Sequence, residues 1–294
     1  MIVTLKNHTM TARIDSIGAQ LISLKSGSGT EYIWQRDPAH WKSSSPLLFP
    51  TVGNCRDGKY TLNGQIYSIP KHGFCRNADF AVSVLSEQEA SFILTDSPET
   101  RAHYPFAFHL KLTYALTEDG IRIHYTVTNP GTGPMYYQLG AHPGFNCPLH
   151  SGERFEDYVL EFEQEGTAGY HSYDLNRMEF NMNSYTPILD HAAVIPLTHE
   201  LFANDAIFFT DLRSKKVALK NQATGYGVEV SYPDFATVAF WTAAATKAPF
   251  LCVEPWNGSA IRSDEDDNFL NRHFLQKVES GESKEYQIWI KKIS

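Results

Sequence analysis

Hydrophobic residues recur at every second position along much of the chain, which is the spacing of strands rather than helices. Apolar and polar residues alternate over 108–116 and again over 121–127, on either side of the turn residues Glu118-Asp119-Gly120. This pattern predicts a long antiparallel hairpin with one buried face. The pair Asn63-Gly64 predicts a second hairpin within residues 60–69, because both residues tolerate the positive φ of a tight turn.

Shorter apolar runs predict further strands, and helical signals are few. A third hairpin is expected from residues 81–85 and 90–94, and single strands are expected at 20–24, 32–34, 159–162, 206–209, 217–220, 228–232, 238–241, 250–253 and 286–290. Asp37-Pro38 and Ser97-Pro98 each place a capping residue before a proline, which favours a helix start. Residues 198–202 and 264–273 are predicted as one or two helical turns each. With no βαβ rhythm, the chain is expected to be all-β, one antiparallel sandwich domain over residues 1–294.

Charge and cysteine content narrow the range of functions. The chain has 25 Lys and Arg against 33 Asp and Glu, a net charge of −8, which disfavours nonspecific binding to nucleic acid or to anionic membranes. No apolar run approaches the roughly 20 residues that span a bilayer, and the N-terminus does not resemble a signal peptide. The four cysteines show no CxxC spacing, so they are predicted to be reduced thiols in a cytoplasmic protein.

Candidate chemistry gathers in four segments that combine Gly or Pro with aromatic and titratable residues: 48–56, 71–76, 140–146 and 251–258. Loops on a rigid β scaffold are where functional residues are usually found. Among these, His72, His142 and Glu254 offer acid–base chemistry near neutral pH. Aromatic residues such as Phe145 and Trp256 could stack on the apolar face of a sugar.

Each of these residues also has a plainer interpretation. The two histidines could be hydrogen-bonded loop residues, and Glu254 could pair with Arg56 or Arg76. The acidic run at residues 264–267 is typical of a solvated helix start. A metal site is disfavoured because the His-x-His spacing of cupin-like centres is missing. Phosphate-loop, dinucleotide-binding and nucleophile-elbow motifs are missing as well, so no cofactor is expected.

The order and spacing of these segments resemble the aldose 1-epimerase, or galactose mutarotase-like, family and within it the shorter LacX-like branch. The resemblance runs from about Asn7 to Ile290. It is sharpest at Phe49-Pro50 through Arg56, at His72-Gly73-Phe74 with Arg76, at His142-Pro143-Gly144-Phe145-Asn146, and at Val253-Glu254-Pro255-Trp256. It implies a galactose mutarotase-like β-supersandwich of antiparallel strands with an open sugar cleft.

The resemblance also implies roles for individual residues. Glu254 falls at the general base that takes the proton from the C1 hydroxyl of a sugar, and His142 at the general acid that protonates the ring oxygen. His72 falls at a second histidine that polarises the ring-oxygen region. The substrate-binding positions are Arg56, Asp205, Arg76, Phe145 and Trp256.

The expected reaction is the interconversion of the α and β anomers of a hexose through ring opening and reclosure. We expect a carboxylate at Glu254 and an imidazolium at His142, on opposite sides of the sugar carbon. Two alternatives stay open: a hexose-6-phosphate 1-epimerase that uses Lys71 and Arg76 for the phosphate, and a noncatalytic carbohydrate-binding protein. The sequence does not fix the sugar, and an open sheet edge leaves a homodimer as a further possibility.

Overall fold

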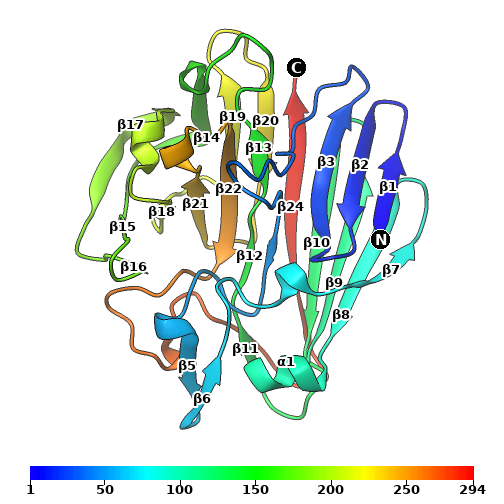
Figure 1. Ribbon diagram of the computed structural model, residues 1–294, viewed down its shortest axis with the longest axis vertical. Helices are drawn as coiled ribbons and strands as arrows, with labels where there is room; N and C mark the ends of the chain where they lie inside the picture. Colours follow the sequence, from blue (N-terminus) through cyan, green and yellow to red (C-terminus); the bar gives the residue numbers. More distant parts are fainter.

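The alternating segments around residue 120 form the middle of the largest sheet in the computed structural model, which describes residues 1–294 (Figure 1). This sheet has nine strands, and every pairing in it is antiparallel. In spatial order they are β17 (Thr186–Pro196), β14 (Tyr158–Tyr170), β19 (Lys216–Asn221), β20 (Gly227–Ser231), β24 (Ser283–Ile293), β10 (Gly120–Thr128), β9 (His109–Leu116), β8 (Glu89–Thr95) and β7 (Ala81–Val84).

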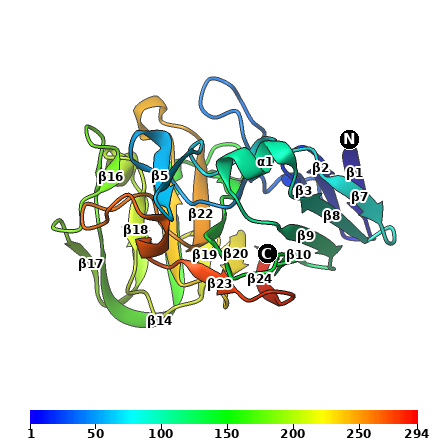
Figure 2. The same ribbon diagram turned by 90° about the horizontal axis from the view of Figure 1, so that it is seen from below.

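A six-stranded and a three-stranded sheet form the opposing layer (Figure 2). The six-stranded sheet contains β18 (Ile207–Phe209), β21 (Thr237–Trp241), β22 (Phe250–Asn257), β12 (Leu139–Ala141), β4 (Leu47–Leu48) and β13 (Gly144–Asn146). The three-stranded sheet contains β1 (Ile2–Lys6), β2 (Met10–Asp15) and β3 (Gln20–Ser26). Three two-stranded pairs complete the strands: β5 (Lys59–Leu62) with β6 (Gln65–Ser68), β11 (Met135–Tyr137) with β23 (Gln276–Val278), and β15 (Tyr173–Asp174) with β16 (Glu179–Phe180).

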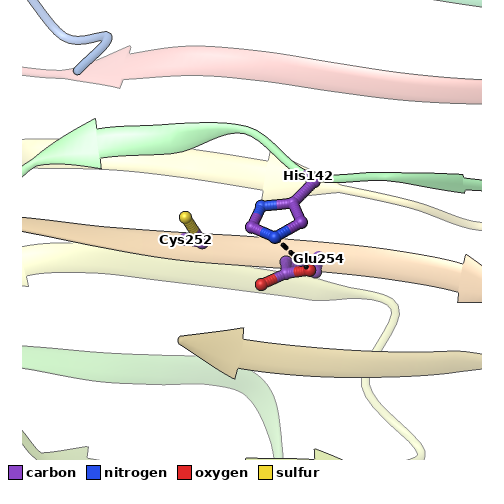
Figure 3. A group of neighbouring side chains, drawn as sticks. All are labelled: His142, Cys252 and Glu254. Atoms are coloured by element: carbon purple, nitrogen blue, oxygen red, sulfur yellow. Dashed lines mark ion pairs between the residues drawn. The ribbon is translucent and has the colours of Figure 1, made fainter. Parts of the chain in front are cut away.

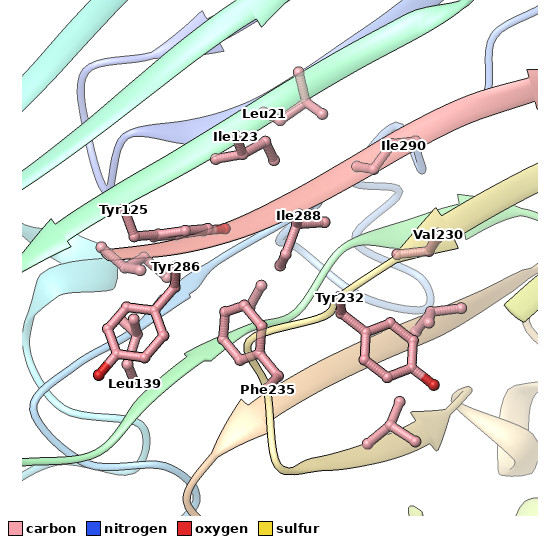
Figure 4. Packing of buried hydrophobic residues seen from close by; sticks show 14 of the residues in the cluster. Leu21, Ile123, Tyr125, Leu139, Val230, Tyr232, Phe235, Tyr286, Ile288 and Ile290 are labelled. Atoms are coloured by element: carbon pink, nitrogen blue, oxygen red, sulfur yellow. The ribbon is translucent and has the colours of Figure 1, made fainter. Parts of the chain in front are cut away.

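The main apolar core lies between these layers and contains 62 buried residues. Figure 4 shows side chains from β10, β20 and β24 facing Leu139 of β12 and Leu21 of β3. Two tyrosines in this core form a hydrogen bond with each other, since the hydroxyls of Tyr137 and Tyr286 lie 2.8 Å apart. The core therefore fixes β12, which leads directly into His142, against the nine-stranded sheet.

The predicted hairpins are confirmed. β9 and β10 pair from Leu116↔Ile121 to His109↔Thr128, with the predicted apolar face buried. Asn63 and Gly64 connect β5 to β6 with φ of 50° and 78°. β7 and β8 form the third hairpin. β3 confirms the strand predicted at 20–24, whereas β1, β2 and the long edge strand β17 were not predicted.

The helices are short. α1 (Pro98–His103) begins after Ser97, whose hydroxyl accepts a hydrogen bond from the Thr100 amide at 3.3 Å, as the Ser97-Pro98 signal predicts. The 3₁₀ helices are η1 (Arg56–Gly58), η2 (Cys75–Asn77), η3 (Phe155–Asp157), η4 (His199–Phe202), η5 (Ala244–Thr246) and η6 (Phe269–Asn271). No helix has the length and apolar character required to cross a lipid bilayer.

Two local predictions are wrong, and a third is met only in part. Asp37-Pro38 begins a turn and not a helix, because the Asp37 side chain accepts the Ala39 amide and closes the chain locally. Residues 32–34 make only an isolated bridge between Ile33 and Phe145. Residues 264–273 are irregular except for η6, since their acidic side chains bond to nearby arginines and amides instead of capping a helix.

Candidate active site

The centre of the six-stranded sheet presents one face of β22 to a cleft. All eight residues of β22 are buried. Because alternate side chains of a strand point to opposite faces, Leu251 and Val253 enter the main core. Cys252, Glu254 and Trp256 point the other way. Glu254 and Trp256 line a cleft with a volume of about 260 Å³. The strand period thus brings the Glu254 carboxylate to the wall of the cleft, although only 2% of the residue is exposed.

His142 reaches the same cleft from the segment that joins β12 to β13. Both of these strands pair with β22, so His142 is held directly beside it. Its Nε2 lies 3.1 Å from Oε2 of Glu254 (Figure 3). The imidazole stacks on Trp41, with ring centroids 5.0 Å apart and an interplanar angle of 26°. The edge of Trp241 contacts it from another side.

Burial sets the protonation of this pair. It raises the pKa of the Glu254 carboxyl well above its usual range, and the negative charge of Asp205 adds to the shift. Burial also lowers the pKa of His142 to about 3, with a smaller contribution from Arg76. Both shifts favour the uncharged form, so a proton resides more readily on the carboxyl and less readily on the imidazole than in water. This differs from the expected carboxylate and imidazolium on opposite sides of a sugar, since the two groups are in direct contact.

His72 is held by a tight turn with an unusual backbone. His72 and Gly73 have φ of 68° and 72°, and a Cβ on Gly73 would lie 2.1 Å from the carbonyl oxygen of Phe49. The amide of His72 donates to the Gly53 carbonyl at 2.6 Å, and the Gly53 amide donates to Nδ1 of His72 at 3.0 Å. Nδ1 is therefore an acceptor, which puts the ring proton on Nε2. Burial lowers the pKa of His72, so the ring is neutral and Nε2–H is a donor on the cleft wall.

Aromatic side chains and one carboxylate form much of the rest of the cleft wall. Trp41, Trp241, Tyr173 and Phe180 line the cleft. The Tyr173 hydroxyl donates to the Asn54 side chain at 2.9 Å, which fixes the β15–β16 pair at the rim. Asp205 also lines the cleft. It follows η4 in a left-handed conformation with φ of 74°. Flat rings beside carboxylate and imidazole groups suit a ligand with apolar faces and many hydroxyls.

Two cations, Lys71 and Arg76, line the same cleft. Arg76 donates to the Ser43 hydroxyl at 3.2 Å. Neither side chain lies within ion-pair distance of a carboxylate in the structure, although most other arginines of the chain do. The cleft therefore carries positive charge that the protein itself does not neutralise by direct contact.

Arg56 and Phe145 are not in the cleft. The guanidinium of Arg56 lies 2.7 Å from Asp267 and 3.2 Å from Glu179, in ion pairs that tie η1 to two distant loops. Phe145 is fully buried in the main core. Its neighbour Gly144 faces Trp41 and Cys252, so the strand period turns Phe145 to the opposite face. The structure brings together the other predicted residues: Glu254, His142, His72, Asp205, Arg76 and Trp256.

A thiol adjoins the acid–base pair. Cys252 is two residues before Glu254 on the same face of β22, and His142, Cys252 and Glu254 each place a potential ligand atom within 4.8 Å of the others (Figure 3). Burial raises the pKa of the Cys252 thiol, with a contribution from Glu254. All four cysteines are free and buried.

Comparison with known proteins shows the family of the chain. A family model described as aldose 1-epimerase matches residues 1–266. The chromosomal LacX protein of Lactococcus lactis subsp. lactis is 33% identical over 284 residues, which is 95% of each chain. The chain belongs to the aldose 1-epimerase family.

Solved structures extend the family assignment to the fold. A galactose mutarotase related enzyme from Lactobacillus acidophilus superimposes with a TM-score of 0.94 at 30% identity, covering 100% of this chain and 98% of the other. A galactose mutarotase-like protein from Lactobacillus casei gives a TM-score of 0.92 at 28% identity, with both chains fully covered. This aldose 1-epimerase family member thus has the galactose mutarotase-like fold that the sequence resemblance implied.

Several cleft residues were not predicted from the sequence. Trp241 is the last residue of the strand predicted at 238–241. Its closeness in sequence to the candidate segment 251–258 was a signal that could have indicated the cleft. Trp41 lies in an irregular loop with no periodicity, so nothing in the sequence placed it against His142. Tyr173 and Phe180 belong to a two-residue strand pair that is too short to give a pattern.

Proposed function

We propose that this aldose 1-epimerase family member interconverts the α and β anomers of a hexose by acid–base ring opening and reclosure. The observation that carries the proposal is the contact between His142 and Glu254 on the wall of an aromatic cleft. Ring opening removes one proton from the C1 hydroxyl and adds one to the ring oxygen. A pair that shares one proton can perform both transfers without changing its total charge.

The direct contact of the pair fits the chemistry of a hemiacetal. Its two oxygens are bonded to the same carbon, so two side chains lying next to each other can reach both at once. On substrate binding, Oε2 of Glu254 would exchange its bond to Nε2 for the C1 hydroxyl, and Nε2 would turn to the ring oxygen. For this, the proton that the carboxyl holds in the resting pair passes to Nε2, so that Glu254 acts as the general base and His142 as the general acid, each contributing on the order of 10²–10⁴-fold. Reclosure after rotation of the carbonyl gives the other anomer.

The surrounding residues suit the binding of a sugar. Nε2–H of His72 is placed to donate to the ring-oxygen region, and Asp205 to accept from a hydroxyl. Trp41, Trp241 and Trp256 offer flat apolar surfaces for the ring. No electrons move in the reaction, so the proposal requires no redox cofactor.

The test of this proposal is catalysed anomer exchange, followed by NMR of a reducing hexose with and without the protein. We expect exchange faster than the spontaneous rate for the wild type and its loss for Glu254→Gln, with an unchanged circular dichroism spectrum. A protein that binds the sugar without accelerating exchange would instead be a noncatalytic carbohydrate-binding protein.

The two cleft cations favour a second candidate, a hexose-6-phosphate 1-epimerase. Lys71 and Arg76 line the cleft without a carboxylate in contact, which is the arrangement that an anionic substrate group would complete. The reaction and the acid–base pair stay the same, and only the substrate differs. Exchange measured on a hexose and on its 6-phosphate, at equal concentration, separates the two candidates.

A further inference from the structure

We propose that His142, Cys252 and Glu254 form a binding site for a thiophilic divalent cation, and that its occupation inhibits the protein. The three side chains place one nitrogen, one sulfur and one oxygen atom within 4.8 Å of one another. Tetrahedral zinc sites use these ligand types, and three protein ligands with a fourth position open are a common arrangement. Small side-chain rotations bring atoms at these separations to coordination distance.

The geometry of the strands determines how the three side chains of this cluster are arranged. Cys252 and Glu254 lie two residues apart on β22 and therefore on one face, while His142 approaches from the segment between β12 and β13. Figure 3 shows the Glu254 carboxyl below the His142 ring and the Cys252 sulfur to the left of the ring. The site is thus built from two neighbouring chain segments that already pair through β13 and β22.

The His142 ring is anchored on one side only. Its side chain is 10% exposed, Nε2 contacts Glu254, and Nδ1 is buried without a hydrogen-bond partner. No hydrogen bond at Nδ1 therefore resists the small rotation of the ring that coordination requires.

Charge balance favours the bound state once the thiol is deprotonated. A thiolate and a carboxylate together neutralise a divalent cation, so no net charge is buried. Binding would release the thiol proton and the proton shared by His142 and Glu254, about two protons for each cation. The cation must enter through the cleft, because Cys252 itself has no exposed surface. Lys71 and Arg76 oppose its entry, and Asp205 favours it.

The bound cation would inhibit the protein because it occupies the lone pairs that the proposed reaction uses. Nε2 of His142 and the carboxylate of Glu254 are the atoms that would move protons in the proposed reaction, and a coordinated atom cannot do so. The inhibitory consequence rests on the proposed function, whereas the binding site does not.

The binding site is tested without reference to catalysis. The metal-free protein is titrated with Cd²⁺ in a weakly buffered solution, while the ultraviolet thiolate-to-metal charge-transfer band and the released protons are recorded. We expect the band to saturate at one cation per chain with release of about two protons. Cys252→Ala should abolish the band, and Cys147→Ala, which removes another fully buried thiol from the main core, should retain it.

Further variants keep the test independent of folding defects. If Cys252→Ala does not fold, His142→Asn keeps the thiol and should still weaken Cd²⁺ binding by about 100-fold, more than the loss of most outer-shell partners. A band that persists in Cys252→Ala, or that is lost equally in Cys147→Ala, would overturn the site.

The inhibition part of the proposal is tested by measuring the rate of anomer exchange in the presence of Zn²⁺. Each variant is compared with its own rate in the presence of a chelator. We expect Zn²⁺ to slow the wild type and Cys147→Ala but not Cys252→Ala. Faster exchange with Zn²⁺ would contradict inhibition. A protein without exchange activity that still gives the Cd²⁺ band would refute the proposed function and leave the metal site standing.

Discussion

Nε2 of His142 and Oε2 of Glu254 lie 3.1 Å apart, and neither side chain is more than a tenth exposed. The pKa of the carboxyl is raised and the pKa of the imidazole is lowered, both chiefly by burial. Both shifts favour the uncharged form of each group, so the pair links the pH dependence of stability to the chemistry of the cleft.

The first prediction concerns stability as a function of pH. In the unfolded chain the two groups titrate near 4.5 and 6.5, so the unfolded pair holds two protons below this window and none above it. In the folded chain the carboxyl keeps its proton to a higher pH, and the imidazole gains one only at a lower pH. The contribution of the pair to stability is therefore greatest between these values and falls on both sides.

The double variant His142→Asn/Glu254→Gln checks this relationship, because it has no titrating group at either position. We expect its free energy of unfolding, from urea denaturation, to change less with pH than that of the wild type. Above pH 6.5 the free energy of unfolding of the wild type should fall with rising pH more steeply than that of the variant. Parallel profiles would show that the pair does not hold its proton as described.

The second prediction concerns Arg56, which the structure places outside the cleft. Arg56→Ala removes ion pairs to Glu179 and Asp267 at a side chain that is 35% exposed. The Asp267 carboxylate is exposed, and the buried Glu179 carboxylate keeps a second partner in Arg177 at 3.6 Å. Exposed ion pairs contribute about 1 kcal/mol or less, so we expect a small loss of thermal stability and an unchanged KM. A KM that rises more than about tenfold at unchanged stability, a difference of 1.4 kcal/mol, would place Arg56 at the substrate after all.

The third prediction concerns Trp41, which stacks on His142 and lines the cleft. Aromatic stacking contributes about 0.5–1.5 kcal/mol beyond burial, so Trp41→Ala should lower kcat/KM of anomer exchange by up to roughly tenfold. Trp41→Phe should restore most of the loss, since a phenyl ring can stack on the imidazole. Equal rates for all three proteins would remove Trp41 from the site.

Much of the fold was predictable because its strands have one buried and one wetter face. Alternation placed β9 and β10, a short apolar run placed β22, and the strand period of β22 brings Glu254 to the cleft. The same period explains the failure at Phe145, whose neighbour Gly144 occupies the cleft-facing position. The position of Arg56 in its motif could not show where its side chain points. The next residue, Asp57, has a left-handed backbone conformation, and η1 turns the chain away from the cleft there. Contacts such as that between Trp41 and His142 join distant segments and leave no local signal.

The fourth prediction separates phosphorylated from neutral sugars. If a phosphate completes the two-cation group, Arg76→Ala should raise KM for a hexose 6-phosphate by roughly 10- to 100-fold, since hydrogen bonds to charged groups contribute about 1.5–3 kcal/mol. KM for the free hexose should change less, and Arg76→Lys should recover part of the loss. Equal effects on both sugars would indicate that Arg76 does not recognise phosphate.

The central claim is that His142 and Glu254 work as one proton-transferring unit on a hemiacetal. A double-mutant cycle on the rate of anomer exchange tests this most directly, using wild type, His142→Asn, Glu254→Gln and the double variant. We expect each single variant to lose on the order of 10²–10⁴-fold, and the double variant to be scarcely slower than either, because groups that act together are not additive. Single variants that keep the wild-type rate, or losses that multiply in the double variant, would contradict the claim.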